Sequence, residues 1–483
     1  MKIVELEDFN LERQGKTIIR HGALEIARGE QILLSGASGS GKTSLGMALA
    51  GQLFAKALKC QFNFVVNVDL LPKVSLVSQF FYFKDKTGLS DFYYQQRYNS
   101  YDSEHAATVR ETLDYVSDDQ KLNELLVVLN LVERLDAPLI QLSSGERKKL
   151  QLILALRAPS QIMILDNPYI GLDIHSRDNL IAYLTKLACA GVTFIIIDDD
   201  IQIPSFITHV IWIDATLEIQ KVCREDYVSL PVVNLSQALQ VNKLELAPLV
   251  DSYAEIVKLE QVTIKYGARL ALNKIDWLVL AGQKWLVSGQ NGAGKSTLLS
   301  LINGDHPQAY ANEIYLFERK RGSGESIWDI KQKIGFVSPE LHWNFDTSMT
   351  CLETILSGYF DTPGLYHKTT SQQQQVAHDW LMRLELTEYA AQRLALVSNG
   401  IQRMLLLLRA LIKNPPLFIL DEPCQGLDDR QTANFVRLVD DLFADSQHTI
   451  IYVSHRADQI PACISHRLCL EHGESIPCAA LEK

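Results

Sequence analysis

The chain has 483 residues, more than one ordinary domain contains, so two or three domains are expected. Hydrophobic residues make up 47% of it and charged residues 21%, which allows large buried cores and excludes wholesale disorder. The formal net charge of −11 disfavours non-specific binding to nucleic acid, because contacts with phosphate need clustered cations.

The apolar segments of the chain bear on its location. No run approaches the ~20 apolar residues that span a bilayer, and the first residues do not resemble a signal peptide. The eight cysteines form no CxxC pair, so we expect buried free thiols rather than metal or disulfide frameworks. These features predict a soluble protein of the cytoplasm.

An internal duplication organises the chain. A glycine-rich stretch, a Ser-x-Gly segment, an apolar run ending in aspartate and a Gly-Leu-Asp triplet each occur twice, in the same order. The paired positions, 253 or 255 residues apart, are Gly36 and Gly289, Gly145 and Gly400, Asp166 and Asp421, and Asp173 and Asp428. We therefore predict a first domain over 1–226, a linker over 227–255 and a second domain over 256–483.

Within each copy, apolar runs rich in β-branched residues alternate with helical stretches. The predicted strands cover 31–34, 73–78, 162–165 and 193–197 in the first copy, and 284–287, 417–420 and 449–453 in the second. This alternation predicts an α/β fold with a largely parallel central sheet.

Each copy has a GxxxxGK[ST] motif, at 36–43 and at 289–296, between a predicted strand and a predicted helix. The glycines let backbone N–H groups converge on phosphates at a helix N-terminus. The lysines would reach the outer phosphates of a nucleotide, and Thr43 and Ser296 would ligate Mg²⁺. The residues expected to bind nucleotide are Gly36, Ser38, Gly39, Gly41, Lys42 and Thr43, and Gly289, Asn291, Gly292, Gly294, Lys295, Ser296 and Thr297.

Two further segments indicate which family of nucleotide-binding proteins the chain resembles. Residues 142–146 (LSSGE) lie about 20 residues before the acidic strand end and resemble the LSGGQ signature of ABC ATPases. Residues 397–401 (VSNGI) are a weaker counterpart. The resemblance implies that ATP is the ligand and that Ser143, Gly145, Ser398 and Gly400 contribute to binding it. It also implies two tandem P-loop ABC domains, each with a helical signature subdomain.

The second copy has a near-complete set of catalytic candidates. Asp421 and Glu422 follow an apolar strand; Asp421 would hold Mg²⁺ through water, and Glu422 would act as general base. His455 follows the next strand and resembles the switch histidine that senses the γ-phosphate. Tyr266 matches the aromatic residue that stacks on adenine in ABC ATPases.

The first copy lacks parts of this set. Asn167 replaces the glutamate and cannot accept a proton at neutral pH. Asp199 aligns with the switch histidine and would repel a γ-phosphate. Arg13 stands at the position of the adenine-stacking tyrosine.

In the segment that resembles the Q-loop, the first copy keeps the expected residue and the second copy lacks it. The first copy keeps Gln79, which we expect to join Thr43 and Asp166 as a Mg²⁺ ligand. The second copy has Pro339 there, which offers no side-chain oxygen to the metal. Glu340 or a water could replace the missing glutamine.

ABC ATPases close head-to-tail, so each site combines the phosphate loop of one domain with the signature of the other. By this resemblance the second phosphate loop faces the better signature, at 143–146, and the first faces the poorer one, at 398–401. The defects then gather in one composite site, with Pro339 as the exception. We expect one hydrolytic site and one site that mainly holds nucleotide.

Residues 304–338 and 356–361 closely resemble the ModF-type tandem ABC ATPases, which are associated with molybdate transport. The resemblance is strong in the second domain and looser in the first. It implies a cytoplasmic ATPase peripheral to the inner membrane, with a membrane permease as partner. The aromatic residues within 80–101 either form a docking surface for such a subunit or fill a core.

Other functions remain open. Tandem ABC proteins that act on ribosomes usually carry a long basic linker and two catalytic glutamates. Sugar-import tandem ATPases usually have the degraded site in their second domain. A regulatory or DNA-repair role is known for ATPases of the chromosome-maintenance type, which separate their halves with coiled coils, and no sustained heptad is present here. Pro339 keeps open an ATP-gated binding module without turnover. The basic triplet 319–321 is expected to form a solvated turn rather than a nucleic-acid contact.

Overall fold

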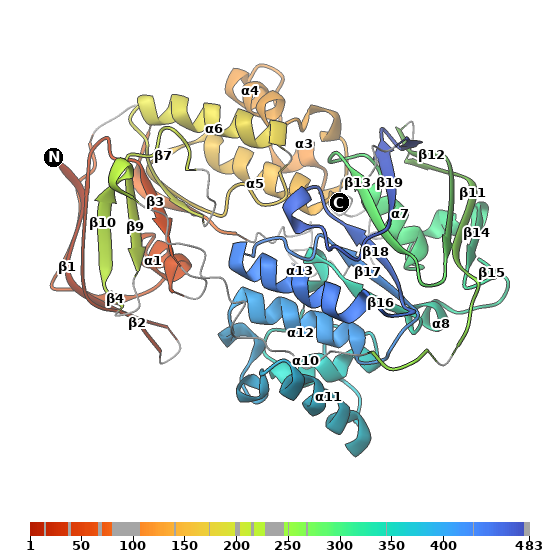
Figure 1. Cartoon of the computed structure of the whole chain (residues 1–483). Coiled ribbons are helices and arrows are strands. Elements are labelled where there is room, and N and C mark those ends of the chain that lie inside the picture. Colours follow the sequence, from red (N-terminus) through yellow and green to blue (C-terminus); the bar gives the residue numbers. More distant parts are fainter. Residues whose placement is uncertain are drawn as a thin grey trace. The chain divides into compact units, whose positions relative to one another are not determined.

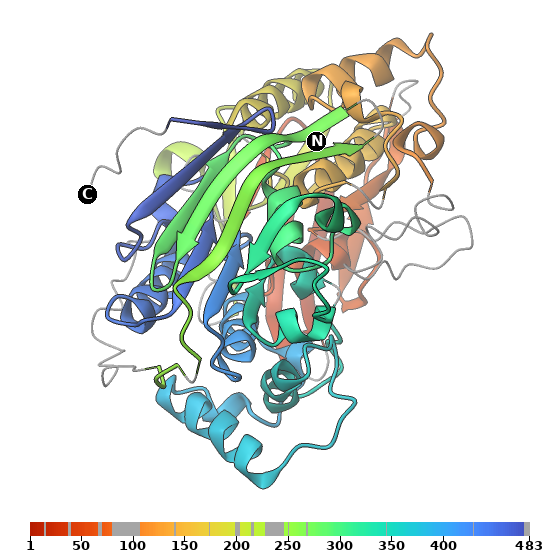
Figure 2. The same cartoon turned by 90° about the vertical axis from the view of Figure 1, so that its right-hand side faces the viewer.

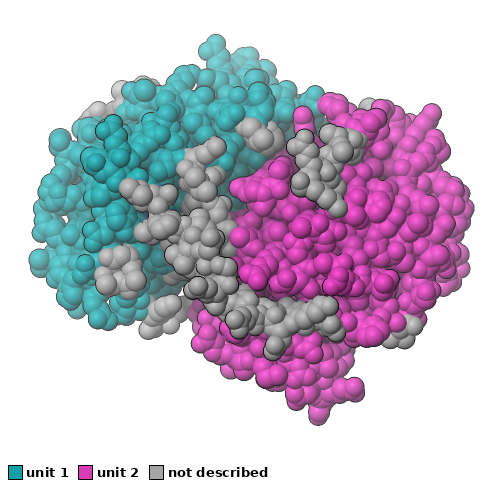
Figure 3. Space-filling model, in the orientation of Figure 1, with its two compact units in different colours: residues 1–90, 106–232 teal, residues 91–105, 233–483 magenta. Residues whose placement is uncertain are grey.

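The computed structural model divides into two compact units. Unit 1 comprises residues 1–90 and 106–232, and unit 2 comprises residues 91–105 and 233–483 (Figure 3). The structure describes residues 1–13, 16–36, 40–65, 70–79, 107–139, 142–172, 174–198, 203–213, 217–227, 246–249, 251–266, 269–343, 345–427 and 429–477.

Unit 1 contains a mainly parallel sheet with the strand order β10-β9-β3-β8-β7-β6. Its strand β10 pairs antiparallel with β9 at the edge, and the other neighbours are parallel. The strands are β3 (Ile32–Ser35), β6 (Leu71–Val77), β7 (Ser160–Asp166), β8 (Thr193–Ile197), β9 (His209–Ile213) and β10 (Ile219–Cys223).

Unit 2 repeats this topology as β16-β17-β18-β13-β19-β20, again with one antiparallel strand at the edge. The strands are β13 (Lys284–Gly289), β16 (Ile334–Val337), β17 (Leu417–Asp421), β18 (Thr449–Val453), β19 (His466–Glu471) and β20 (Glu474–Ile476). The predicted α/β fold with a largely parallel sheet is therefore confirmed in both copies.

The central strands explain why this prediction succeeds. All residues of β8 and β18 are buried, because both faces of the sheet are covered by other elements. Strands buried on both faces read as continuous apolar runs, which is the pattern the sequence shows. Asp166 and Asp421 end two such strands, at the edge of a parallel sheet where α/β proteins bind ligands.

Each unit also has an antiparallel sheet that we did not predict. In unit 1 it consists of β1 (Lys2–Arg13), β2 (Lys16–Ala27), β4 (Ala55–Lys56) and β5 (Lys59–Phe62). In unit 2 it consists of β11 (Glu255–Tyr266), β12 (Arg269–Leu280), β14 (Glu313–Leu316) and β15 (Arg319–Lys320). Figure 2 shows β11 and β12 as two long green strands side by side. Buried and exposed residues mix along β1 and β11, so a search for continuous apolar runs misses them.

Helices complete each unit. Those of unit 1 are α1 (Lys42–Leu49), α3 (Val109–Thr112), α4 (Gln120–Val128), α5 (Ser144–Arg157) and α6 (Ile174–Cys189). Those of unit 2 are α7 (Lys295–Ile302), α8 (Ile327–Lys331), α9 (Pro339–Trp343), α10 (Cys351–Leu356), α11 (Ser371–Arg383), α12 (Asn399–Leu411) and α13 (Asp429–Phe443). The helix α10 packs against both α11 and α12 (Figure 1), and residues of all three helices join one apolar core.

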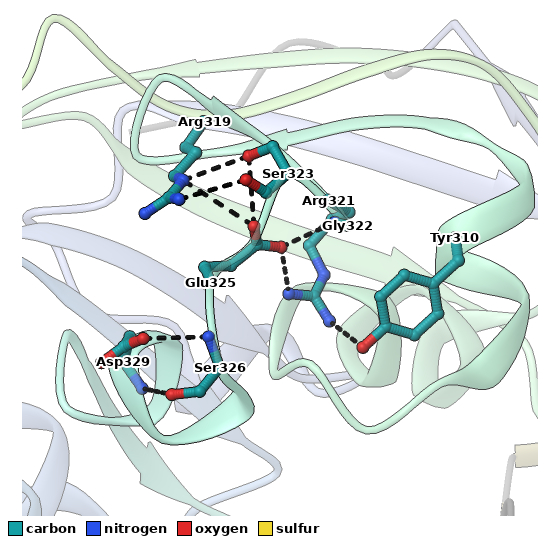
Figure 4. A network of polar contacts seen from close by, with 8 residues as sticks. All are labelled: Tyr310, Arg319, Arg321, Gly322, Ser323, Glu325, Ser326 and Asp329. Atoms are coloured by element: carbon teal, nitrogen blue, oxygen red, sulfur yellow. Dashed lines mark hydrogen bonds and ion pairs between the residues drawn. The ribbon is translucent and has the colours of Figure 1, made fainter.

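The basic triplet departs from its predicted state at one residue. Arg319 and Lys320 are exposed, as expected, but the side chain of Arg321 is only 1% exposed. Its Nη1 donates to Glu325 Oε1 at 2.8 Å, and its guanidinium lies over the ring of Tyr310 (Figure 4). Glu325 neutralises the charge inside the fold, so Arg321 is part of a buried polar network rather than a solvated turn.

The cysteines also differ in part from the prediction. Cys351 and Cys424 are free and buried, as expected, but the free thiols of Cys60, Cys189 and Cys223 are exposed. Cys469 is disulfide-bonded, which the absence of a CxxC pair did not indicate. Among the helices that the structure describes, none is long and apolar enough to cross a bilayer.

Candidate functional site

In both units a glycine with a left-handed backbone starts the helix that follows the predicted phosphate loop. Gly41 has φ of 103° and precedes α1, and Gly294 has φ of 101° and precedes α7. A Cβ atom at Gly294 would lie 2.6 Å from the carbonyl oxygen of Ala271, so both conformation and space exclude a side chain. The loop can thus present backbone N–H groups to an anion at the helix start.

The loop lysines occupy matching positions. Lys42 Nζ donates to the carbonyl oxygen of Gly36 at 2.5 Å, and Lys295 Nζ donates to that of Gly289 at 2.7 Å. Both lysines are 8% exposed. Each ammonium group therefore lies inside its loop, where phosphate oxygens could replace the carbonyl acceptors.

The other loop residues are placed in part. Ser38 and Gly39 lie outside the described residues. Asn291 and Gly292 lie in the loop before α7, and Thr297 lies in its first turn. Gly292 has φ of 83° and an exposed backbone.

A hydroxyl group and a carboxylate meet where the sequence predicts a metal. In unit 1, Thr43 Oγ1 donates to Asp166 Oδ2 at 2.9 Å, and Asp166 is 1% exposed. Such oxygen donors are the ligands that Mg²⁺ prefers, so this pair fits the expected ion. In unit 2, Ser296 is the second residue of α7 and Asp421 is the last of β17, which are the equivalent positions.

Glu422 and His455 come together at the ends of β17 and β18. His455 Nδ1 lies 3.3 Å from Glu422 Oε1. Burial alone would raise the pKa of Glu422, but the hydrogen bond and charge of His455, with the charges of Lys295 and Arg403, hold it below the usual value. Glu422 is therefore ionised at neutral pH and can accept a proton.

Unit 1 has the same backbone at this point but a different side chain. Asn167 has φ of 47° and Glu422 has φ of 40°. The N–H of Asn167 donates to Ile197 O at 2.8 Å, and that of Glu422 donates to Val453 O at 3.0 Å. An amide in this place cannot accept a proton. Asp199, the predicted counterpart of His455, lies outside the described residues.

The two signature segments both cap a helix, with unequal strength. Ser143 caps α5 in a reciprocal capping box with Glu146, whose carboxylate also pairs with Arg134 at 2.6 Å. Gly145 lies in the first turn of α5. Ser398 caps α12 by accepting from the N–H of Ile401 at 3.5 Å. Gly400, next to this cap, is buried, and a Cβ there would lie 2.6 Å from the side chain of Gln431.

The Q-loop positions differ in structure as well as in residue. Gln79 lies two residues beyond the end of β6. Pro339 begins the helix α9, and the hydroxyl of Ser338 accepts from the N–H of Leu341 at 3.0 Å. Proline suits the first helical position because the missing N–H has no intrahelical partner there.

Tyr266 ends β11 and has a support that sequence reasoning missed. Its hydroxyl lies 2.8 Å from His306 Nε2, while His306 Nδ1 accepts from the N–H of Gln308 at 3.2 Å. Burial lowers the pKa of His306 to about 4, so the ring is neutral at physiological pH. His306 lies within residues 304–338, the segment that resembles the ModF-type ATPases, and this position was the sequence signal that could have identified it. In unit 1, Arg13 instead reaches α1 and donates from Nη1 to Ser44 Oγ at 3.4 Å.

Known proteins are similar to the chain along most of its length. The sequence model of the ABC transporter family matches residues 19–170 and 272–425. The ABC transporter ATP-binding protein ModF of Escherichia coli K12 is 35% identical over 458 residues, which are 92% of this chain and 92% of that protein. An uncharacterized ABC transporter ATP-binding protein of Schizosaccharomyces pombe is 29% identical and covers 95% of this chain and 96% of its own length.

Among solved structures, an ATP-binding cassette of an ABC transporter in its ADP conformation is 25% identical, with a TM-score of 0.40. It covers 46% of this chain and 89% of its own length. The two family matches fall on the two copies of the repeat, and each includes a phosphate loop and the acidic end of a central strand. The chain therefore belongs to the ABC transporter family of ATP-binding proteins and is a tandem ATPase.

Proposed function

We propose that the protein hydrolyses ATP at one competent site and holds nucleotide at a second, degenerate site. One observation carries this proposal: Glu422 contacts His455 in unit 2, whereas unit 1 has Asn167 on the same backbone. A general base is available in the first arrangement and missing in the second.

In the competent site the phosphate loop would bind the triphosphate. Lys295 would exchange its carbonyl acceptors for oxygens of the outer phosphates, where its charge stabilises the transition state. Ser296 and Asp421 would hold Mg²⁺, which when bound neutralises charge on the phosphate oxygens. Glu422 would accept a proton from the attacking water, and His455 would contact the γ-phosphate. Tyr266 would stack on the adenine ring.

In the degenerate site Lys42 would bind the phosphates, and Thr43, Asp166 and Gln79 would hold Mg²⁺. The contact of Thr43 Oγ1 with Asp166 Oδ2 at 2.9 Å supports that ion. Asn167 would leave the attacking water without a base, so bound ATP would persist there.

The two domains, 1–226 and 256–483 with a linker at 227–255, would close head-to-tail. Ser143 and Gly145 would then complete the competent site, and Ser398 and Gly400 the degenerate one. Two helix N-termini with a serine cap support this arrangement, because such ends favour anions.

The proposed cellular role follows from similarity. The ABC transporter ATP-binding protein ModF of Escherichia coli is 35% identical to this chain. Residues 304–338 resemble the ModF-type ATPases, and that resemblance implies an association with molybdate transport. We infer a cytoplasmic ATPase at the inner membrane that supports molybdate uptake with a permease partner. The aromatic segment 80–101, a candidate for that contact, lies outside the described residues. Co-purification with ribosomes or DNA instead of a permease would favour the alternatives.

Steady-state ATP hydrolysis tests the competent site. We expect Glu422→Gln to lower kcat about 100-fold or more, because the amide cannot take the proton of the attacking water. The matched variant Asn167→Gln keeps an amide in unit 1 and should leave kcat within about two-fold of wild type. Full turnover in Glu422→Gln would contradict the proposal. Tight ATP binding without turnover in the wild type would favour an ATP-gated module. Pro339, at the Q-loop position, would be consistent with that outcome because it offers no side-chain oxygen to the metal.

A further inference from the structure

A buried arginine ties three parts of unit 2 together. Arg403 lies in α12, in the first turns after the signature segment, and is 2% exposed. Its Nη1 donates to Ser338 O at 3.2 Å, at the end of β16, and its Nη2 donates to Gln425 O at 3.1 Å. Burial lowers the pKa of Arg403 to about 10, so the guanidinium remains charged at neutral pH.

Gln425 continues this connection to the candidate general base. Its Nε2 donates to Glu422 Oε2 at 3.3 Å, and its backbone N–H donates to Glu422 O at 3.0 Å. His455 contacts the other carboxylate oxygen, Oε1. Both oxygens of Glu422 are thus contacted, and the side chain is held from two directions.

The side-chain oxygen of Gln425 adds a second observation. It is buried and has no hydrogen-bond partner among the described residues. A buried acceptor without a partner is unfavourable, and such groups persist mainly where function uses them. A glutamine in this place is therefore better explained by its contact with Glu422 than by packing.

Unit 1 has a buried cation at the position of Arg403, but among the residues that the structure describes this cation is not connected through a glutamine to the residue in the position of Glu422. Lys148, 255 residues before Arg403, donates from Nζ to Ser78 O at 3.0 Å and to Asp166 O at 3.2 Å. The attachment to the end of the neighbouring strand is therefore common to both units. Lys148 bonds to the last residue of β7, whereas the planar fork of the Arg403 guanidinium reaches Gln425 in the loop after β17.

The residue beyond that point also differs. Ile170 stands at the position of Gln425, in a turn whose N–H bonds to Asn167 O at 3.4 Å. The turn itself is therefore the same in both units, but isoleucine has no donor for a neighbouring side chain. The unit that lacks the glutamate also lacks the amide that would orient it.

We propose that Arg403 and Gln425 are positioning residues for Glu422: the arginine fixes the loop 422–425 against the end of β16, and the glutamine orients the carboxylate. This inference rests on the proposed role of Glu422 as general base. A displacement of about 1 Å in a reacting group can lower a rate about 100-fold, so the fixed loop matters for turnover.

The two variants that test it introduce the residues of unit 1. Gln425→Ile removes the donor to Glu422, and Arg403→Lys keeps a buried cation but loses the contact with Gln425 O. We expect each to lower kcat roughly 10- to 100-fold while KM for ATP changes by less than about two-fold. The control Ile170→Gln places the amide in unit 1 and should leave kcat at the wild-type value.

A double variant separates positioning from general damage to the fold. Because the two residues act in series on one carboxylate, Arg403→Lys combined with Gln425→Ile should lose little more activity than the worse single variant. Independent structural damage would multiply the losses. Wild-type kcat in Gln425→Ile, or a raised KM with unchanged kcat, would overturn the inference.

Failure of the inference and failure of the proposed function give different results. If Glu422→Gln loses turnover but Gln425→Ile does not, the base stands and the positioning role is wrong. If Glu422→Gln keeps turnover, the proposed function itself is wrong. Should Arg403→Lys not fold, Gln425→Ile carries the test, with thermal unfolding measured to show that its stability matches wild type.

Discussion

Units 1 and 2 share a backbone around the phosphate loop and strand ends but differ in the side chains placed on it. Gly41 and Gly294 begin their helices with nearly the same φ, and Asn167 and Glu422 make the same backbone hydrogen bond to the neighbouring strand. Strand pairing and helix starts fix these loops, and neither depends on the catalytic side chains. A unit can therefore lose its base without losing its shape.

The contacts beyond the backbone show where the two units diverge. Glu422 in unit 2 is held by His455 and Gln425, and Tyr266 is supported by His306. In unit 1 the better-supported segment is the signature, where Arg134 forms an ion pair with Glu146. Unit 2 therefore retains the polar contacts around its candidate base, and unit 1 retains the stronger polar contacts at its signature.

The largest expected effect tests whether the two phosphate loops are unequal in turnover. Lys295→Ala should lower ATP hydrolysis about 100-fold or more, because it removes charge from the developing transition state. Lys42→Ala, which removes an equally buried lysine with the same loop contact, should leave a measurable rate. If Lys42→Ala is the inactive variant, the assignment of turnover to the phosphate loop of unit 2 is wrong.

A smaller effect concerns the stability of the signature in unit 1. Glu146→Ala removes the partly buried ion pair with Arg134 and the cap partner of Ser143, so we expect a loss on the order of 3 kcal/mol in the free energy of unfolding. Denaturant titration of the variant against wild type measures this loss. The control Asp136→Ala breaks an exposed pair with Arg110 and should change stability little.

The pH dependence of that loss has a defined sign. Burial alone would raise the pKa of Glu146, but the charge and hydrogen bond of Arg134 and the donors of Ser143 hold it below the ordinary 4.5. The stabilisation is therefore complete above pH 4.5 and disappears as the pH falls through the lower pKa of the folded state. A difference between wild type and variant that grows on acidification would contradict this account.

The smallest effect concerns nucleotide affinity. In a Lys42→Ala background, where unit 2 supplies the intact loop, Tyr266→Ala should weaken ATP binding about 10-fold, because stacking on a base is worth roughly 1–3 kcal/mol. Arg13→Ala in the same background should leave the Kd unchanged. Equal losses in the two variants, measured by equilibrium titration, would show that the adenine contact does not distinguish the units.

Much of the fold was predictable from local sequence. The predicted strands 193–197 and 449–453 coincide with β8 and β18, because a run buried on both faces must be apolar throughout. The loop motifs were predictable for the same kind of reason, since a tight turn into a helix demands glycine at Gly41 and Gly294. The antiparallel sheets were missed because their strands carry a weaker, mixed pattern.

The candidate site was predictable as a set of residues but not as a set of contacts. Motifs named Glu422 and His455, yet nothing local shows that Gln425 turns toward that carboxylate or that His306 meets Tyr266. The buried state of Arg321 was likewise invisible, because its partner Glu325 lies in the same polar stretch of sequence. The spacing of 255 residues between Lys148 and Arg403 was an available signal for a shared role.

The sequence by itself determined the duplication, the family and the difference in candidate catalytic residues between the two copies. Residue identity is enough for this, because it decides which side chains can accept a proton and which positions can adopt a left-handed backbone. The tertiary structure alone decided which polar groups are buried together and which carbonyl oxygens a buried cation reaches. Those contacts join residues far apart in the chain, such as Ser338, Arg403 and Gln425, and only the packing of strands against helices brings them within hydrogen-bonding distance.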